Sequence, residues 1–199
     1  MAKKIGIYSG TFDPVHNGHI GFCLEAIRAC DLEQVVLLPE RQPRIKTNVT
    51  PMPHRFAMLE LAVQPFEQLT ALQLQSEQFS VQTTLPELQR IFAGHELTML
   101  LGSDVVCSFL RSWPGLDILL QNVSLAIGLR QPDTQQATEA ILQELQTKLS
   151  TPIRHTFVQN LHPTITSSHI RHGKHMSGDI NPHVVRYMTE HTLYETVGA

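Results

Sequence analysis

Residues 4–19 read Lys-Ile-Gly-Ile-Tyr-Ser-Gly-Thr-Phe-Asp-Pro-Val-His-Asn-Gly-His, and this stretch decides the fold. It begins with a short apolar run, residues 4–8, which is typical of a buried strand. From residue 18 to residue 30, apolar side chains then recur at helical spacing. The stretch therefore predicts a strand, a turn through Gly10 and Pro14, and a helix.

The same alternation of strand and helix continues along the chain. We expect strands at residues 4–8, 35–38, 69–74, 97–101, 123–129 and 153–158. We expect helices at residues 18–30, 53–63, 80–93, 103–111, 133–149, 166–174 and 182–194. Pro86, together with the capping-box spacing of Thr84 and Glu87, predicts that the third of these helices begins late. The proline-rich residues 39–52 predict a long loop.

Apolar strands that alternate with helices predict a sheet covered on both faces, because only burial on both sides favours uninterrupted apolar runs. Such strands are joined by crossover helices and lie parallel. The expected architecture is a doubly wound α/β fold with a mostly parallel sheet, in which ligands bind outside the carboxyl ends of the strands. We expect one domain over residues 1–199, with the last motif and the C-terminal helices in residues 160–199.

The composition excludes several classes of protein. Of the 199 residues, 42% are hydrophobic and 17% charged, and the formal net charge is -3. This balance is unlike the basic field of a nucleic-acid-binding protein, so any bound anion must be held by a local site. No apolar run has the length of a signal sequence or a membrane span. The three cysteines Cys23, Cys30 and Cys107 form no CxxC pair and are typical of a reducing compartment. We expect a cytoplasmic protein with small-molecule partners, and neither nucleic acid nor membrane.

The turn after the first strand carries two histidines, His16 and His19, three positions apart. This spacing places both imidazoles on one face of the first turn of the following helix. A helix start also presents backbone N–H groups and the positive end of the helix dipole. These features together predict a site for the phosphates of a nucleotide.

A second segment, residues 165–171, reads Ile-Thr-Ser-Ser-His-Ile-Arg and opens another predicted helix. Its three consecutive hydroxyl residues are good candidates for capping the helix. Arg171 follows closely, and a guanidinium can bind phosphate oxygens through two parallel hydrogen bonds. This segment therefore predicts further phosphate contacts.

The two segments resemble the signatures of a known enzyme family. Residues 10–19 are similar to the GxFxPxHxGH signature of the HxGH nucleotidyltransferases, and especially of the bacterial nicotinate/nicotinamide mononucleotide adenylyltransferases. Residues 165–171 are similar to the family's second signature, ISSTxIR. Further similarities are to the PxxxPPHK loop (residues 39–46), the HRxxMLxLA helix (residues 54–62), the GxD…W segment (residues 102–113) and an arginine that closes the fifth strand (Arg130). The resemblance extends from residue 4 to about residue 194 and implies a Rossmann-like nucleotidyltransferase fold.

The resemblance implies transfer of AMP from ATP to nicotinate or nicotinamide mononucleotide in NAD biosynthesis, with release of pyrophosphate. The implied catalytic residues are Thr11, His16, His19, Lys46 and Arg171. The implied ATP-binding residues are Ser9, Gly10, Phe12, Gly18, Ser167, Ser168 and Ile170. The implied acceptor-binding residues are Thr84, Gly102, Asp104, Trp113 and Arg130. Mg²⁺ is expected to be held mainly by the phosphates of ATP, so no protein ligand is assigned, and a homo-oligomer is left open.

One segment departs from the family pattern. The family usually has SYTxxTL, whereas residues 79–85 read Phe-Ser-Val-Gln-Thr-Thr-Leu. Val81 stands where the resemblance implies a threonine that helps to hold the nicotinate carboxylate, and it cannot donate a side-chain hydrogen bond. The pair Tyr8-Ser9 also resembles the pantetheine-phosphate adenylyltransferases, although these enzymes have threonine in place of His16. Three alternatives therefore stay open: phosphopantetheine as acceptor, another phosphorylated acceptor, and a nucleotide-binding protein with little turnover.

Histidines gather near the C-terminus, including His169, His172 and His175 at steps of three residues. Such spacing can align imidazoles for a structural metal ion. Gly173 interrupts the predicted helix, however, and no cysteine or carboxylate in the segment completes a ligand set. The pattern favours histidines that bind no metal.

Overall fold

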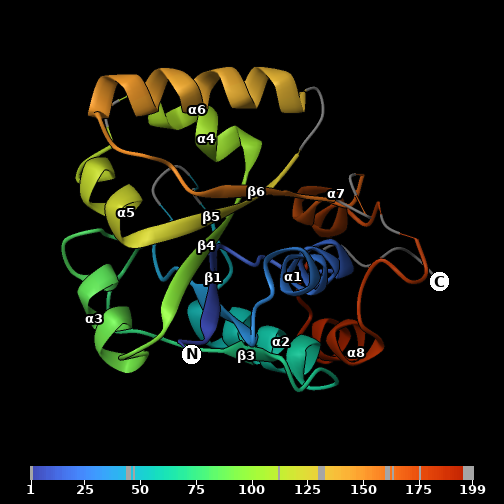
Figure 1. Ribbon diagram of the computed structural model, residues 1–199. Coiled ribbons are helices and arrows are strands. Elements are labelled where there is room, and N and C mark those ends of the chain that lie inside the picture. The colour runs from blue at the N-terminus through green and yellow to red at the C-terminus, as the bar shows by residue number, and fades with distance from the viewer. Residues whose placement is uncertain are drawn as a thin grey trace.

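The computed structural model describes residues 2–43, 46, 48–111, 113–129, 133–159, 162, 164–174 and 176–194. Within these residues the chain forms a six-stranded parallel sheet with the strand order β3-β2-β1-β4-β5-β6 (Figure 1). The strands are β1 (Lys4–Gly10), β2 (Gln34–Pro39), β3 (Leu69–Ala71), β4 (Glu96–Gly102), β5 (Val123–Gly128) and β6 (His155–Val158). The strand order reverses between β1 and β4, which is the usual place for a ligand in a fold of this kind.

Helices cover both faces of the sheet. They are α1 (Asn17–Cys30), α2 (Met52–Val63), α3 (Thr84–Ile91), α4 (Ser103–Phe109), α5 (Leu116–Asn122), α6 (Gln135–Leu149), α7 (Ser167–Arg171) and α8 (Pro182–Glu190). In Figure 1, α3, α4, α5 and α6 lie on one side of the sheet, and α1, α2 and α8 lie on the other. The expected doubly wound α/β fold is confirmed, and the sheet is parallel throughout its described strands.

Strand β2 shows why the central strands are apolar along their whole length. Val35 and Leu37 belong to the core on the α1, α2 and α8 side, whereas Val36 and Leu38 belong to the core on the other side. Successive side chains of a strand point to opposite faces, so a strand covered twice needs apolar residues at every position. All four side chains are accordingly buried.

The described elements differ from the sequence predictions in a few places. Strand β3 at the sheet edge ends at Ala71, and helix α8 ends at Glu190, before a backbone at Thr192 with φ of 52°. Helix α5 was not expected, although its buried residues Leu116, Leu119 and Leu120 have helical spacing.

The predicted late start of α3 is confirmed, but the predicted capping box is wrong. Thr83 occupies the cap position and Thr84 is the first helical residue. The Thr84 hydroxyl instead accepts a hydrogen bond from the backbone N–H of Ser80 at 3.0 Å. The hydroxyl therefore stabilises the turn before the helix and not the helix end itself.

The cysteines are all free thiols. Cys23 is buried in the core, and burial raises the pKa of its thiol well above the usual range. Cys30 and Cys107 are partly buried. None of the described helices combines the length and the apolar character that a membrane crossing needs.

Strand β5 ends against helix α1 at a contact that requires a glycine. A Cβ atom at Gly128 would lie only 2.8 Å from the ring of Phe22, with all its nearest neighbours in that one side chain. The Phe22 ring is itself buried and packs edge-on against Tyr8, with 5.5 Å between ring centroids. The ring therefore has little room to move.

We expect Gly128→Ala to lower the free energy of unfolding by about 1–3 kcal/mol, because overpacking forces side chains out of their preferred positions. Denaturant titration of the purified protein measures this loss. The matched control is the same substitution in a Phe22→Leu background, where the smaller side chain leaves space and the loss should shrink. An equal loss in both backgrounds would assign the effect to the backbone of β5 and not to Phe22.

Candidate active site

The candidate site is built on the turn between β1 and α1, at the carboxyl edge of the sheet. Residues 10–16 form this turn, which we call the phosphate turn. Phe12 and Val15 point into the core and are almost completely buried. Phe12 adopts a left-handed backbone with φ of 49°. A non-glycine residue is strained in this region, and the buried side chains of Phe12 and Val15 hold the turn in this conformation.

His16 and His19 lie side by side at the start of α1. Their ring centroids are 3.7 Å apart, and His16 is the cap residue of the helix. The backbone N–H of His16 donates to Nδ1 of His19 at 3.2 Å. Since Nδ1 acts as the acceptor, the neutral ring of His19 carries its proton on Nε2, which makes Nε2 a hydrogen-bond donor. The sequence-based pairing of the two imidazoles on one face is thus what the structure has.

The helix start offers fewer backbone donors than the sequence suggested. The N–H of Asn17 donates to the carbonyl of Asp179 at 2.8 Å, and that of His19 donates to the carbonyl of His16 at 2.9 Å. The side chain of Asn17 also donates to the Gly178 carbonyl at 2.6 Å. The N–H of Asn17 thus serves the contact with the segment before α8, and that of His19 serves the first turn of α1 itself.

Gly18, one of the expected ATP-binding residues, lies at a position where a side chain would collide with the ring of His16. A Cβ atom there would lie 2.9 Å from Nδ1 of His16. Any larger residue would therefore push the His16 ring away from its neighbour. Gly18 keeps the two imidazoles together.

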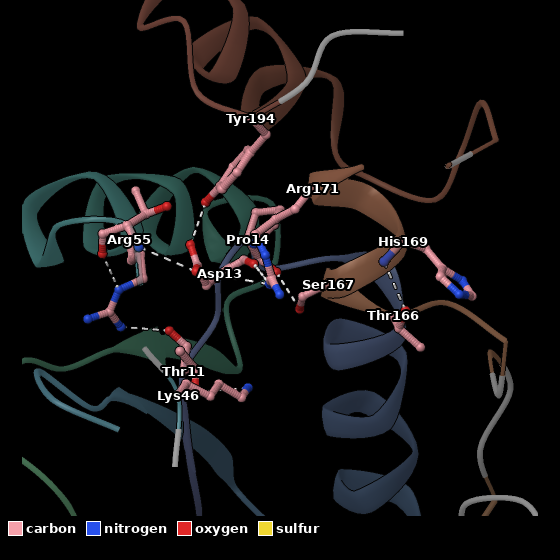
Figure 2. Close-up of polar contacts among 11 residues, drawn as sticks. Thr11, Asp13, Pro14, Lys46, Arg55, Thr166, Ser167, His169, Arg171 and Tyr194 are labelled. Carbon is pink, nitrogen blue, oxygen red and sulfur yellow. Dashed lines mark hydrogen bonds and ion pairs between the residues drawn. The ribbon is translucent and has the colours of Figure 1, made fainter. Parts of the chain in front are cut away.

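Two cationic side chains reach the phosphate turn from other parts of the chain (Figure 2). Nζ of Lys46 donates to the Thr11 hydroxyl at 3.1 Å. Nη1 of Arg171 donates to the Asp13 carbonyl at 2.7 Å, and Ser167 on the same helix donates to the Pro14 carbonyl at 2.9 Å. Segments that are far apart in the sequence thus meet at one turn.

The helix α7 that carries Arg171 is capped as expected. The Thr166 hydroxyl accepts a hydrogen bond from the N–H of His169 at 3.2 Å. Ser168 is exposed, whereas Ile170 is buried in the core beneath the helix. Both Ile170 and Phe12 were expected to contact ATP, but their side chains pack inside the protein. Contacts of these two residues with ATP would therefore have to come from their backbone atoms.

Arg55 belongs to the candidate site by its contacts, although the sequence patterns placed it on a helix without giving it a role. Its side chain is 1% exposed, and it donates to three backbone carbonyls, at 2.7 Å to Thr11, 2.8 Å to Thr50 and 3.1 Å to Arg41. Burial lowers the pKa of this guanidinium, and the negative charge of Asp13 opposes that effect. Arg55 therefore joins the phosphate turn to both ends of the loop that carries Lys46.

Asp13 is a second residue without an expected role. Its carboxylate is 4% exposed, accepts a hydrogen bond from the Tyr194 hydroxyl at 2.7 Å, and lies 4.0 Å from Nη1 of Arg171. The N–H of Thr50 also donates to it at 3.4 Å. Nothing in the local sequence around Tyr194 signals this contact, because its partner lies at the other end of the chain.

The expected acceptor-binding residues follow the neighbouring strand β4. Gly102 ends β4, and Asp104 is exposed in the first turn of α4. Trp113 packs edge-on against Phe109, with 4.8 Å between ring centroids. Because β1 and β4 are parallel neighbours, these residues lie at the same edge of the sheet as the phosphate turn. Arg130 lies outside the described residues.

Val81 and Thr84 line the turn that precedes α3. Val81 is buried and packs against Gly115, whose φ is 76° and where a Cβ atom would lie 3.1 Å from the valine. Thr84 is buried as well and donates to the Ser76 hydroxyl at 3.4 Å. The side chains of Val81 and Thr84 are thus both packed inside the protein. Ser9, an expected ATP-binding residue at the end of β1, donates to the Glu40 carboxylate at 3.3 Å.

The described residues hold no cluster of three or more histidine, cysteine, aspartate or glutamate side chains that could bind a metal ion. His169 and His172 are exposed on and after α7, and His175 lies outside the described part of the chain. The imidazole, ammonium and guanidinium groups around the phosphate turn are groups that can donate hydrogen bonds to an anion.

The amino-acid sequence is similar to a known family model and to known proteins. The family model described as cytidylyltransferase-like matches residues 7–173. A probable nicotinate-nucleotide adenylyltransferase of Neisseria meningitidis serogroup B is 30% identical and covers 97% of this chain and 99% of its own length. A probable nicotinate-nucleotide adenylyltransferase of Pseudomonas aeruginosa is 33% identical over 73% of this chain and 69% of its own.

A solved structure shares the fold. The nicotinic acid mononucleotide adenylyltransferase of Plasmodium falciparum, complexed with NaAD, superposes with a TM-score of 0.76 at 19% identity, covering 96% of this chain and 97% of that one. Since the family match includes both the phosphate turn and α7, the chain belongs to the cytidylyltransferase-like family of nucleotidyltransferases and is a relative of the nicotinate-nucleotide adenylyltransferases.

Proposed function

We propose that this protein transfers the adenylyl group of ATP to nicotinate mononucleotide, or to nicotinamide mononucleotide, giving the dinucleotide and pyrophosphate in NAD biosynthesis. The observation that carries the proposal is the meeting of His16, His19, Lys46 and Arg171 at one turn. The similarity to nicotinate-nucleotide adenylyltransferases over nearly the full chain supports the choice of acceptor.

The reaction needs no protein nucleophile. A phosphate oxygen of the mononucleotide, already ionised at neutral pH, attacks the α-phosphorus of ATP. The bond from that phosphorus to the bridging oxygen breaks, and the bridging oxygen leaves with pyrophosphate. The protein contributes by positioning the two phosphates and by stabilising the charge that develops between them.

Each group around the phosphate turn has a role in this scheme. His16 and Thr11 contact the α-phosphate, and the Nε2 donor of His19 steadies the adjoining phosphates. Lys46 and Arg171 neutralise the departing pyrophosphate, with Ser167 and Ser168 adding hydrogen bonds. Mg²⁺ enters with ATP as part of the substrate, held by phosphate oxygens and water, as is usual for this ion.

The acceptor would lie beside the phosphate turn, between β4 and the turn before α3. Asp104 is exposed there and suits a ribose hydroxyl, and Trp113 offers an aromatic surface to a planar ring. Val81, however, offers no side-chain donor to a ring carboxylate. This single observation favours a second candidate, the same transfer to another phosphorylated acceptor such as phosphopantetheine.

The first prediction about the reaction concerns the acceptor. With ATP and Mg²⁺, we expect pyrophosphate release with nicotinate mononucleotide or nicotinamide mononucleotide and none with phosphopantetheine. A coupled pyrophosphate assay measures this, and chromatography identifies the dinucleotide. Release with phosphopantetheine alone would establish the second candidate. ATP binding without release for any of the three acceptors would favour a nucleotide-binding protein with little turnover.

The second prediction concerns the paired imidazoles. His16→Ala and His19→Ala should each lower kcat by about 10²–10³-fold, as is common when one donor to a developing charge is removed. His19 is partly exposed, so its replacement should change the melting temperature little, whereas His16 is buried and its replacement should also lower the melting temperature. The matched control is His95→Ala, which removes an exposed histidine at the amino end of β4, on the opposite edge of the sheet. A folded, fully active variant at either site position would contradict the scheme.

The third prediction concerns the acid or amide form of the acceptor. Val81→Thr adds a hydroxyl donor next to Gly115, so kcat/KM for nicotinate mononucleotide should rise about ten-fold relative to that for the amide, the scale of one hydrogen bond to a charged group. Steady-state kinetics with both acceptors measure the ratio. An unchanged ratio would place recognition of the ring substituent on other atoms.

A further inference from the structure

The hydroxyl of Tyr194 makes a long-range contact with the phosphate turn that the scheme above does not use. It donates to Oδ1 of Asp13 at 2.7 Å, across 181 positions of sequence. Figure 2 shows the phenol descending from the segment after α8 onto the turn, beside Arg171. The contact thus brings the last described residue of the chain to the site where phosphates are expected.

The backbone around Tyr194 is arranged to make this contact. Tyr194 has φ of 64°, and Thr192 just before it has φ of 52°. Bulky and β-branched residues rarely adopt this left-handed conformation, and it persists where the surroundings hold it. Burial raises the pKa of the phenol well above its usual range, and the nearby charge of Asp13 adds to the rise. The hydroxyl therefore keeps its proton and acts as a donor.

The two oxygens of Asp13 have different neighbours. Oδ1 receives the Tyr194 hydroxyl, while Oδ2 lies 3.4 Å from the N–H of Thr50 and 4.0 Å from Nη1 of Arg171. At 4.0 Å the arginine is beyond hydrogen-bond distance. Instead, the guanidinium donates to the backbone carbonyl of Asp13 at 2.7 Å. The carboxylate and the arginine are thus close neighbours without a direct hydrogen bond between their side chains.

We propose that Tyr194 is a positioning residue that holds the carboxylate of Asp13 and thereby keeps the guanidinium of Arg171 available to the phosphates of ATP. Without the phenol, Oδ1 of the buried carboxylate loses its donor, and the carboxylate turns toward the guanidinium of Arg171, which lies 4.0 Å from Oδ2. A close ion pair between them occupies N–H groups that the phosphates need. This inference rests on the proposed role of Arg171 in binding ATP.

The test is the affinity for an ATP analogue with a methylene bridge between the α- and β-phosphorus, which binds but cannot transfer its adenylyl group. Titration calorimetry on the full chain measures the Kd. Tyr194→Phe removes only the hydroxyl, and we expect the Kd to rise about ten-fold, the usual scale for a lost hydrogen bond to a charged group. In steady-state assays the KM for the mononucleotide acceptor should stay the same.

Tyr187→Phe is the matched control. Tyr187 also belongs to the C-terminal part of the chain, but its hydroxyl lies 3.0 Å from Nδ1 of His54 on α2 and not at the phosphate turn. A general loosening of α8 would affect both variants alike. We expect the Kd of the Tyr187→Phe protein to match that of the unsubstituted protein, and equal rises in Kd for the two variants would overturn the inference.

A double-mutant cycle adds a second readout. In an Asp13→Asn background no ion pair with Arg171 can form, so Tyr194→Phe should raise the Kd by less than ~2-fold, because residues that act through one another are not additive. A full ten-fold rise in that background would overturn the inference, as would an unchanged Kd for Tyr194→Phe alone. Should Asp13→Asn fail to fold, the comparison of the two phenylalanine variants decides by itself.

Binding also separates this inference from the proposed function. An unsubstituted protein that binds the analogue but releases no pyrophosphate with any acceptor contradicts the proposed function, and the Kd values of the variants still decide the role of Tyr194. An unsubstituted protein that does not bind the analogue overturns both.

Discussion

The guanidinium of Arg55 is almost completely buried, and a charge in that position must find hydrogen-bond partners inside the protein. It finds them in three backbone carbonyls, which belong to the phosphate turn and to the two ends of the loop that carries Lys46. Removing a partner would leave part of a buried charge unsatisfied, so the three segments are held in one arrangement. The exposed side chain of Lys46 depends on the buried Arg55, because Lys46 reaches Thr11 only while its loop stays in place.

The two halves of the candidate site differ in how they are built. On the β1 side, polar contacts from α2, α7 and the segment after α8 converge on backbone carbonyls and on the Asp13 carboxylate. On the β4 side, the neighbouring turns meet mainly through packing, with Val81 against Gly115 and Phe109 against Trp113. A hydrogen-bonded half suits phosphate groups, which are negatively charged in every nucleotide. A packed half can change one side chain at a time, which suits the selection of an acceptor.

The sequence was sufficient to predict the sheet and the pairing of two imidazoles at the candidate site, for a physical reason. Strands such as Val35–Leu38 are buried on both faces and therefore carry an apolar residue at every position. Residues such as His16 and His19 act through neighbours three positions away, so their relation is visible in the local pattern. The sequence predicted the late start of α3 for the wrong reason, since Thr84 serves the turn before the helix and not a capping box. The sequence did not indicate the contacts of Arg55 and Tyr194. Arg55 donates to backbone carbonyls, which every residue has. The partner of Tyr194 is Asp13, which lies 181 positions away in the sequence.

The contact between Asp13 and Tyr194 also has a consequence for the order in which the protein is made. The phosphate turn is synthesised before Tyr194, because Asp13 precedes the tyrosine by 181 positions. All six described strands also end before Tyr194. This contact can therefore form only after every strand of the described sheet has been made.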